Sequence, residues 1–300
     1  MENDLGSDDF ENLVSFIRTI VIKDKPKEDI LKEFNNLIFS TGKLRRGKDF
    51  IDYVQSYRTI YQRVILDKEV ELGSNTVAFK NLINIMTDFL QSNEWMPELL
   101  YYFKKFSTNK LYEFLVLLEN KFVADWVIAY TPTKRTVNLN AILKDIEQAK
   151  TAEDVLKSDS LKYDKNALIN ELEKDIYGKR HAKYILLKLE YLETEQINVK
   201  NYGTISVEHV LPQNPKENSK WLENFNIENR KSLTNKLCNL ILLSNKKNSQ
   251  ASNLDFDEKK RKYLSGRLTD LVRSQQVLSY NEWTPQVLKQ RQEKIIKSFE

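Results

Sequence analysis

Apolar residues recur at three- and four-residue steps through most of the chain, from about residue 8 to residue 195. One series runs through Leu111, Phe114, Leu115, Leu118 and Phe122. This spacing is the period of one buried face of an α-helix. Two other series repeat it, at Ile30, Phe34, Leu37 and Ile38, and at Phe79, Leu82, Ile83, Met86 and Leu90. The pattern predicts a bundle of roughly eight to ten helices here.

Short local signals predict where some of these helices begin and where they are joined. Thr151 stands before two acidic residues and resembles an N-cap, and Pro97 suits the first turn of a helix over residues 96–106. Three segments with Gly or Pro in or beside them are predicted connections: residues 41–46, 67–75 and 131–136.

The pattern changes after residues 197–203. Residues 204–215 form a β-branched, partly alternating run that is stopped by prolines, which predicts a short strand and a loop. The apolar run 237–243 predicts a second, buried strand. We therefore expect a mainly α fold with a small α+β part, in which residues 1–195 form a helical domain and residues 196–300 form another.

Helices are expected to complete the second domain. Ser244 can cap a short helix that runs to about Asn253. Two more helices are predicted, near residues 257–273 and 282–299. The expected layout is strand, loop, strand, helix.

The composition excludes several classes of site and segment. The only cysteine is Cys238, so the chain has no intramolecular disulfide, and two histidines are few ligands for zinc. The acidic N-terminus lacks the features of a signal peptide. Charged residues interrupt the most apolar stretch, 111–130, so no membrane span is expected. These features predict a soluble cytoplasmic protein.

Glu208 and His209 stand together at the end of the first predicted strand. Neighbours in a regular strand point to opposite faces, but both side chains can converge where the chain turns into Leu211-Pro212. A histidine has the ordinary pKa that suits removal of a proton from water near neutral pH, and a glutamate offers Mg²⁺ a hard oxygen. Hydrolysis of a phosphodiester needs a base for the attacking water and a cation for the developing charge.

Two asparagines complete this set. Asn239 lies in the second predicted strand, and Asn248 lies nine residues later on the following helix. The Asn239 amide can hold the loop that carries His209, and the Asn248 amide oxygen can complete a metal site opposite Glu208. These residues predict catalytic roles for His209 and Asn239, with a single Mg²⁺ or Mn²⁺ held by Glu208 and Asn248.

At these residues the chain resembles the HNH endonuclease superfamily, in the variant with Asn as its last ligand. More narrowly, it resembles the C-terminal part of the DUF262/DUF1524 family, the GmrSD-type modification-dependent restriction enzymes of bacteria. Residues 208–213 are similar to the family's E-H-I-L-P-Q, residues 237–243 to L-G-N-L-x-L-L, and residues 248–253 to N-S-x-x-S-N. A preceding Y-x-L-x-x-L-E helix is matched at residues 184–190, and a closing W…R helix at Trp283 and Arg291.

The resemblance covers about residues 179–291 and implies a fold and an activity. The fold is an N-terminal helical bundle followed by a ββα-metal (HNH, His-Me finger) nuclease domain with C-terminal helices. The activity is cleavage of DNA, specifically modified phage DNA in an antiviral restriction system. Cys238 stands where the family has Gly, which is expected to alter strand packing more than chemistry.

One part of the family pattern is missing. Its members normally begin with a ParB/sulfiredoxin-like DUF262 domain with a D-G-Q-Q-R motif, to which nucleotide hydrolysis is attributed. The sequence holds no such motif. We therefore expect the chain to be a C-terminal portion, either truncated or the product of a split gene, that works with a DUF262 domain or subunit.

Basic residues concentrate around the motif. Eleven Lys and Arg and four Asp and Glu lie between Arg230 and Arg273, a charge of +7, whereas the whole chain carries +4. Phosphate binding requires such a surface, and five lysines are expected to contact DNA: Lys236, Lys246, Lys247, Lys259 and Lys260. A solvated helix face explains residues 259–262 equally well. The other basic cluster, at residues 43–48, is either a solvated loop or a further DNA contact.

The favoured interpretation is a metal-dependent DNA endonuclease with His209 as general base. One alternative is a non-catalytic DNA-binding or scaffold module with a vestigial centre, in which His209 merely ties a loop to the core. Cleavage of plasmid DNA with and without Mg²⁺ distinguishes the two. A third interpretation makes the helical half an interaction platform for a partner.

Overall fold

The structure is a computed structural model, and it describes residues 6–201, 203–264 and 271–299. Within these ranges the chain is mainly helical with one two-stranded sheet, as the sequence predicts. It divides into two compact units, residues 1–83 with 91–163 and residues 84–90 with 164–300. None of the described helices is long and apolar enough to cross a membrane.

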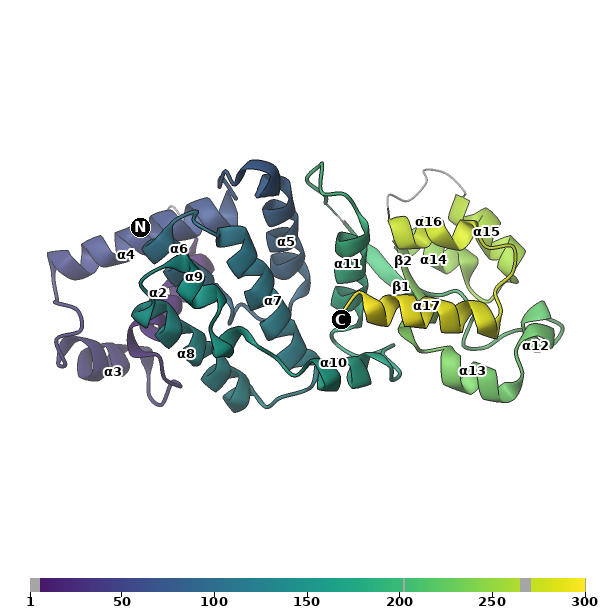
Figure 1. The fold of residues 1–300 in the computed structure, drawn as a ribbon, viewed down its shortest axis with the longest axis horizontal. Helices are drawn as coiled ribbons and strands as arrows, with labels where there is room; N and C mark the ends of the chain where they lie inside the picture. Colours follow the sequence, from purple (N-terminus) through teal and green to yellow (C-terminus); the bar gives the residue numbers. More distant parts are fainter. Residues whose placement is uncertain (1–5, 202, 265–270, 300) are drawn as a thin grey trace. The chain divides into compact units, whose positions relative to one another are not determined.

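The first unit consists of helices with short connections (Figure 1). Its elements are α2 (Ser7–Ile22), α3 (Ile30–Glu33), the π-helix η1 (Phe34–Phe39), α4 (Lys48–Tyr61), the π-helix η2 (Gln62–Leu66), the 3-10 helix η3 (Gly73–Asn75), α5 (Thr76–Phe89, whose end belongs to the second unit), α6 (Met96–Phe106), α7 (Leu111–Val127), α8 (Pro132–Gln148), α9 (Ala152–Leu156) and the 3-10 helix η4 (Asp159–Leu161).

Burial follows the predicted helical period in this unit. Leu111, Phe114, Leu115 and Leu118 of α7 are fully buried, and Phe122 one turn later is nearly so. The core is therefore built from the faces that the apolar spacing marks.

Two of the predicted helix starts are confirmed. α6 spans residues 96–106 with Pro97 in its first turn. At the start of α9, the Thr151 hydroxyl accepts the Asp154 N–H, and the Asp154 carboxylate accepts the Thr151 N–H. This reciprocal pair is a capping box, which fixes the helix start.

The predicted connection at residues 131–136 is wrong. α8 begins at Pro132, and the Thr131 hydroxyl caps it by accepting the N–H of Lys134. Proline at the first helical position needs no hydrogen bond from its nitrogen and is preset for helical geometry. Here Thr-Pro opens a helix instead of marking a loop.

The second unit holds both strands and the C-terminal helices (Figure 1). Its elements are α10 (Lys165–Leu172), α11 (Ala182–Glu193), β1 (Ile205–His209), α12 (Lys220–Asn224), α13 (Ile227–Leu233), the 3-10 helix η5 (Leu237–Asn239), β2 (Leu240–Ser244), α14 (Asn245–Ala251), α15 (Phe256–Leu264), α16 (Val272–Leu278) and α17 (Pro285–Lys297). This unit includes α10 and α11, which the sequence pattern places in the helical domain.

The two strands are antiparallel and pair Ile205 with Ser244 and His209 with Leu240. The second strand begins three residues later than predicted, because residues 237–239 form a 3-10 turn. Asn239 therefore ends this turn and does not lie in the strand. This placement puts its side chain beside the last paired residue of β1.

The predicted helix over residues 257–273 ends earlier. α15 stops at residue 264, residues 265–270 lie outside the described residues, and α16 begins at Val272. The last predicted helix is confirmed with a shorter span, since α17 begins at Pro285 after the N-cap Thr284.

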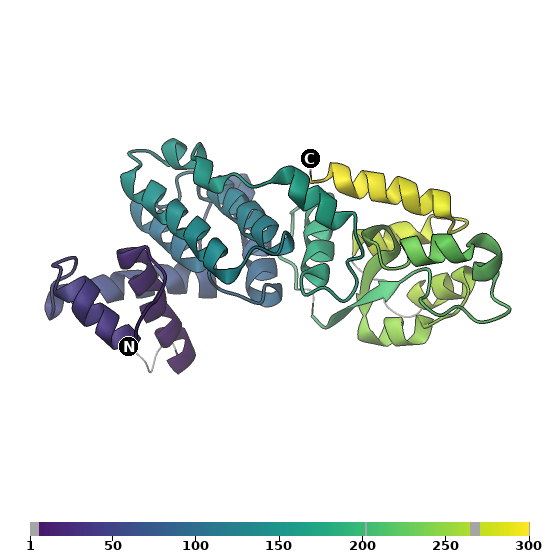
Figure 2. The same cartoon turned by 90° about the horizontal axis from the view of Figure 1, so that it is seen from below.

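Helices cover the strand pair. Residues 240–243 are all buried, and α11, α14 and α16 contact the sheet. Figure 2 shows α17, in yellow, running along one side of this unit. The end of β1 is thus enclosed by elements from widely separated parts of the sequence.

Candidate functional site

The end of β1 carries two ionisable side chains that are almost fully buried. Glu208 is 4% exposed and His209 is 8% exposed. Burial of a charge is unfavourable unless a partner compensates it. The surroundings of these two side chains therefore determine what they can do.

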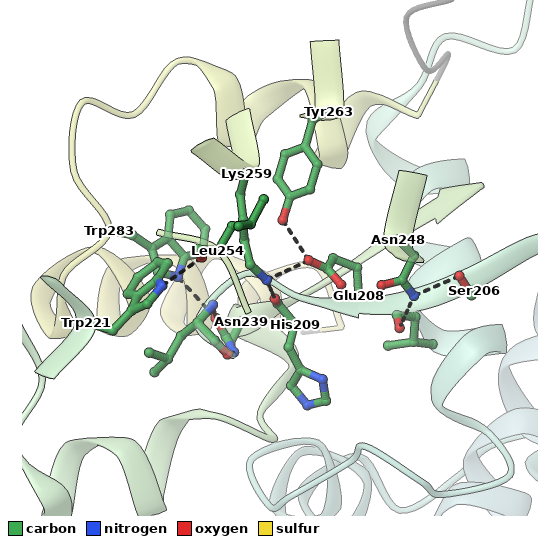
Figure 3. Close-up of polar contacts among 12 residues, drawn as sticks. Ser206, Glu208, His209, Trp221, Asn239, Asn248, Leu254, Lys259, Tyr263 and Trp283 are labelled. Carbon is green, nitrogen blue, oxygen red and sulfur yellow. Dashed lines mark hydrogen bonds and ion pairs between the residues drawn. The ribbon is translucent and has the colours of Figure 1, made fainter. Parts of the chain in front are cut away.

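Glu208 is held by two side chains of α15 (Figure 3). The Lys259 ammonium lies 2.7 Å from Glu208 Oε1, and the Tyr263 hydroxyl donates to the same oxygen at 2.9 Å. Lys259 also donates to the backbone carbonyl of His209, at 2.5 Å. Lys259 is 0% exposed, so one buried ammonium ties α15 to both residues at the strand end.

Burial and pairing act in opposite directions on this pair. Burial raises the pKa of Glu208, and the Lys259 charge and hydrogen bond offset part of the rise. Burial lowers the pKa of Lys259, and Glu208 opposes that change. The short contacts favour the ion pair, because each charge compensates the other in a site with little water.

His209 is oriented by a different set of neighbours. Its Nε2 lies 3.1 Å from Oδ1 of Asn235, and its ring lies 4.1 Å from the Tyr177 ring, centroid to centroid. Gln213 donates to the same Asn235 oxygen at 3.1 Å. An amide oxygen only accepts, so the proton of neutral His209 belongs on Nε2. Nδ1, which has no hydrogen-bond partner within the described chain, is then the basic nitrogen.

Burial determines the protonation state of His209. Burial lowers its pKa to about 4, which the hydrogen bond to Asn235 only partly offsets. The imidazole is therefore neutral near pH 7, and its free nitrogen can accept a proton.

The side chains of Glu208 and His209 do not converge. Figure 3 shows the carboxylate directed towards α15 and the imidazole directed away from it. Both residues are paired in the sheet, so the alternation of a regular strand persists to its last residue. The prediction that both side chains point to one centre is therefore wrong for the described structure.

Asn239 makes the hydrogen bonds that its predicted role requires. Its Oδ1 accepts the Leu211 N–H at 2.8 Å, and its Nδ2 donates to the carbonyls of Leu211 and Thr234 at 2.9 and 2.8 Å. Its backbone carbonyl also accepts the Val210 N–H, at 3.1 Å. The side chain is fully buried. Asn239 thus fixes the segment that directly follows His209.

C-terminal residues complete the support of Asn239. The Trp283 indole donates to Asn239 Oδ1 at 3.1 Å, and Arg291 Nε donates to the Cys238 carbonyl at 3.0 Å. Arg291 also lies over the Trp283 ring, 5.0 Å from its centroid. Trp283 and Arg291, the W…R pair noted in the sequence, therefore stabilise the turn that carries Asn239.

Asn248 lies on α14, which Ser244 caps as predicted by accepting the Lys247 N–H. The Asn248 Nδ2 donates to the Ser206 hydroxyl at 2.9 Å and to the Val207 carbonyl at 3.1 Å. Its Oδ1 has no hydrogen-bond partner among the described residues, and Figure 3 shows it on the side of Glu208. The two bonds from the nitrogen thus orient an unused oxygen.

The oxygens of Glu208 and Asn248 fit a magnesium ion. Mg²⁺ is usually held by one or two protein oxygens and several waters. Both donors of α15 bind Glu208 Oε1, so Oε2 is the oxygen on which a cation would be held. No cluster of three or more His, Cys, Asp or Glu side chains that could hold a metal occurs among the described residues.

The five lysines expected to contact DNA differ in exposure. Lys246 is exposed, Lys236 is half-buried, and Lys247 is half-buried with its ammonium on the Tyr263 carbonyl. The Lys260 ammonium donates to the Tyr280 carbonyl at 2.8 Å. Lys259 was expected on the basic surface, but it is buried against Glu208. Because Lys259 stands in a run of basic residues, the sequence predicts a surface position for it.

Three residues of the site carry no clear signal in the sequence. Asn235 lies in a polar stretch, and Lys259 and Tyr263 lie 51 and 55 residues after Glu208. The one available hint is that Lys259 and Tyr263 are four residues apart, which places them on the same helix face. That spacing alone does not identify their partner.

Residues 162–298 match the profile of a protein family described as GmrSD restriction endonucleases, C-terminal domain. No curated protein matches the chain. The match covers somewhat less than half of the chain and includes β1, β2 and all the site residues described above. It supports the GmrSD-type resemblance for this part and associates it with restriction endonucleases, whose substrate is DNA.

Proposed function

We propose that the second unit is a metal-dependent endonuclease that hydrolyses phosphodiester bonds of DNA at the end of β1. The observation that carries this proposal is the fixed position of His209: a buried, neutral imidazole with Nε2 bound to Asn235 and a backbone anchored by Asn239. A general base must be held in one orientation and be unprotonated at working pH. The match to restriction endonucleases supports DNA as the substrate.

In this mechanism His209 Nδ1 removes a proton from the attacking water. Asn235 retains the proton on Nε2 and stabilises the imidazolium that forms, because its amide oxygen is an acceptor. Asn239 and Lys259 hold the backbone that directly follows the imidazole, through the Leu211 amide and the His209 carbonyl. These contacts keep the base in place while its charge changes.

Glu208 and Asn248 would hold a single Mg²⁺ or Mn²⁺ through Oε2 and Oδ1. The bound ion supplies a positive charge that stabilises the phosphoryl and leaving oxygens. Lys259 assists by keeping Glu208 ionised despite its burial.

The opposed directions of Glu208 and His209 are compatible with this reaction. In displacement at phosphorus the attacking and leaving oxygens lie roughly in line, on opposite sides of the phosphorus. His209 would act on the attacking water, and a cation held by Glu208 and Asn248 would stabilise charge on the leaving oxygen. The phosphodiester would lie across the end of β1.

We propose that the biological target is modified phage DNA in a bacterial restriction system, and that a DUF262 domain or subunit supplies recognition and nucleotide-dependent control. Contacts of a nuclease centre to the DNA backbone carry no sequence information directly. Selectivity would thus come from another part of the system. Lys236, Lys246, Lys247 and Lys260 are proposed to contribute positive charge near the site, with Lys246 the most exposed of them.

A non-catalytic DNA-binding or scaffold module is the second candidate. One observation favours it: the Lys259 ammonium already compensates Glu208, so the carboxylate needs no metal to remain buried. This candidate predicts DNA binding without cleavage at any concentration of Mg²⁺ or Mn²⁺.

Nicking of supercoiled plasmid by the purified chain distinguishes the candidates. We expect nicking with Mg²⁺ or Mn²⁺ and none with a chelator. His209→Ala should lower the rate by about 10²–10⁴-fold, the usual loss on removal of a general base. His181→Ala, which changes the chain's other histidine, is the matched control and should nick normally. Equal rates for the two variants would refute the assignment of His209.

A further inference from the structure

The first unit contains a polar cavity that the proposed nuclease does not use. It has a volume of about 460 Å³. It lies between the end of α2, the loop before α4, and the helices α4, α6 and α8. Its polar lining consists of Lys23, Lys43, Lys144, Tyr53, Tyr101 and Glu147. The volume falls within the usual range for small-molecule sites.

Lys23 is built into the wall of this cavity. It is 9% exposed, its ammonium lies 2.7 Å from Glu147 Oε1, and it lies 5.4 Å from the centroid of the Tyr101 ring. Its backbone is left-handed, with φ 53°, at the C-cap of α2. Glycine is the usual residue at such a turn because a side chain is strained there. Its ion pair and its contact with the Tyr101 ring fix the Lys23 ammonium at the cavity.

The lining carries an excess of positive charge. Three lysines face the cavity with one glutamate, and that glutamate is paired with Lys23. Lys43 and Lys144 are exposed and have no ion-pair partner in the described part of the chain. The carbonyls at the end of α8 do not require them, because Lys105 donates to those of Ile146, Glu147 and Ala149. Two ammonium groups thus remain for an anion.

Two aromatic rings adjoin these cations. Tyr53 and Tyr101 are half-buried and line the same cavity. The Tyr53 ring packs against Tyr57, 5.1 Å from its centroid, which restricts its motion. Aromatic faces next to a cationic surface are the combination on which bases stack in nucleic-acid-binding proteins.

We propose that this cavity binds a nucleotide, with the phosphate at Lys43 and Lys144 and the base against Tyr53 and Tyr101. The nucleotide is either free in solution or a residue of a DNA strand, since both present the same phosphate and base. The proposal stands on the first unit alone and does not depend on nuclease activity in the second.

Calorimetry with the full chain tests the proposal with dGMP, deoxyguanosine, inorganic phosphate and a short single-stranded oligonucleotide. We expect dGMP to bind more tightly than either of its parts. Lys43→Ala with Lys144→Ala should weaken dGMP binding at least about tenfold, because each removes a charge-assisted contact. Lys134→Ala is the matched control, since Lys134 is an exposed lysine of α8 that does not line the cavity.

Substitutions of Tyr53 separate base recognition from simple anion binding. Tyr53→Leu should weaken dGMP binding by about tenfold through loss of stacking, whereas Tyr53→Phe should retain it. Competition of the oligonucleotide with dGMP at the lysine-dependent site would identify a DNA strand as the source. Binding of dGMP alone would identify a free nucleotide, and both results support the proposal.

Three results would overturn it. These are no binding of dGMP at millimolar concentration, binding unaffected by the double lysine change, and phosphate binding as tight as dGMP binding with no response to Tyr53→Leu. His209→Ala should bind dGMP normally. Failure of this site and failure of the nuclease proposal are therefore separate observations.

Discussion

Glu98 of the first unit and Glu208 of the second are both buried, and their surroundings are opposite. Glu98 in α6 is 0% exposed, and neither carboxylate oxygen makes a hydrogen bond to another described residue. Burial raises its pKa to about 8, and the nearby Glu94 charge adds to the rise. Glu208 has an ammonium and a hydroxyl on one oxygen. The same side chain is thus a neutral core group in one unit and an ion-paired carboxylate in the other.

The difference shows that a neighbouring cation determines whether a buried carboxyl is neutral or ionised. A buried carboxyl without a cation avoids its desolvation cost by keeping its proton. A buried carboxyl with a cation of its own remains a ligand, but it depends on that cation. The contrast concerns these two glutamates and not the units as wholes, because the first unit also holds a buried ion pair between Arg18 Nε and Glu33 Oε2, at 2.6 Å.

Removal of the Lys259 ammonium should have the largest effect on this contrast. Lys259→Met leaves Glu208 buried without its cation, and breaking a buried pair typically costs about 3–5 kcal/mol. Urea denaturation measures the change in unfolding free energy. Adding Glu208→Gln to Lys259→Met should recover much of the loss. Lys262→Met, an exposed position on the same helix, is the control; an equal loss there would argue against a special role for the pair.

Substitution of Glu98 should change the stability in the opposite direction, towards a more stable chain. Its folded-state pKa is raised, so its contribution to stability is full at low pH and is lost as the pH rises from the ordinary carboxyl range to about 8. One pKa unit corresponds to about 1.4 kcal/mol. Glu98→Met should remove this pH dependence and stabilise the chain most at pH 8. Thermal unfolding at pH 5 and pH 8 checks this, and a destabilised variant at pH 8 would contradict it.

Asn248 and Asn239 should differ in how they affect the metal requirement. Asn248→Ala removes a proposed ligand and should raise the Mg²⁺ concentration for half-maximal nicking at least about tenfold. Asn239 bonds backbone groups and the Trp283 indole, so Asn239→Ala should lower the rate at saturating Mg²⁺ with a smaller change in that concentration. Asn245→Ala on α14 is the control. Identical metal titrations for all three variants would contradict the ligand assignment.

The smallest effect is expected at the surface. Lys246→Ala should weaken DNA binding slightly and reduce the slope of log affinity against log salt by about 0.9, the value for one phosphate contact. Lys259→Met should leave this slope unchanged, because its ammonium does not reach the surface. Fluorescence anisotropy with a labelled duplex over a range of salt concentrations measures both. If the slope were reduced only in Lys259→Met, then Lys259, and not Lys246, would be the residue that contacts a phosphate.

The sequence predicted the parts of the molecule that local rules determine. The period of residues 111–122 predicted a buried helix face, and the pattern around Glu208 predicted a strand that ends at His209. The predicted loop at Thr131-Pro132 is a helix start, because Pro is common in loops and also at the first position of a helix. The start of β2 was misplaced because residues 237–239 are apolar enough for a strand but form a turn.

The partners of the site residues could not be predicted in this way. Lys259 lies in a basic run that has the composition of a solvated surface, and only the packing of α15 on β1 makes it a buried cation. Asn235 lies in a polar stretch with nothing to distinguish it from its neighbours. Such contacts depend on tertiary structure, which the periodicity of one segment does not contain.

The bonds from Trp283 and Arg291 to the Asn239 turn have a consequence for the order in which the site forms. A ribosome makes residues 205–244 before it makes α17, so both strands exist while these two donors are still missing. Until they arrive, Asn239 Oδ1 lacks its indole partner and the Cys238 carbonyl lacks its guanidinium. The support for His209 is therefore completed late in synthesis. A nascent chain that already contains His209 does not yet hold it in the arrangement of the finished protein.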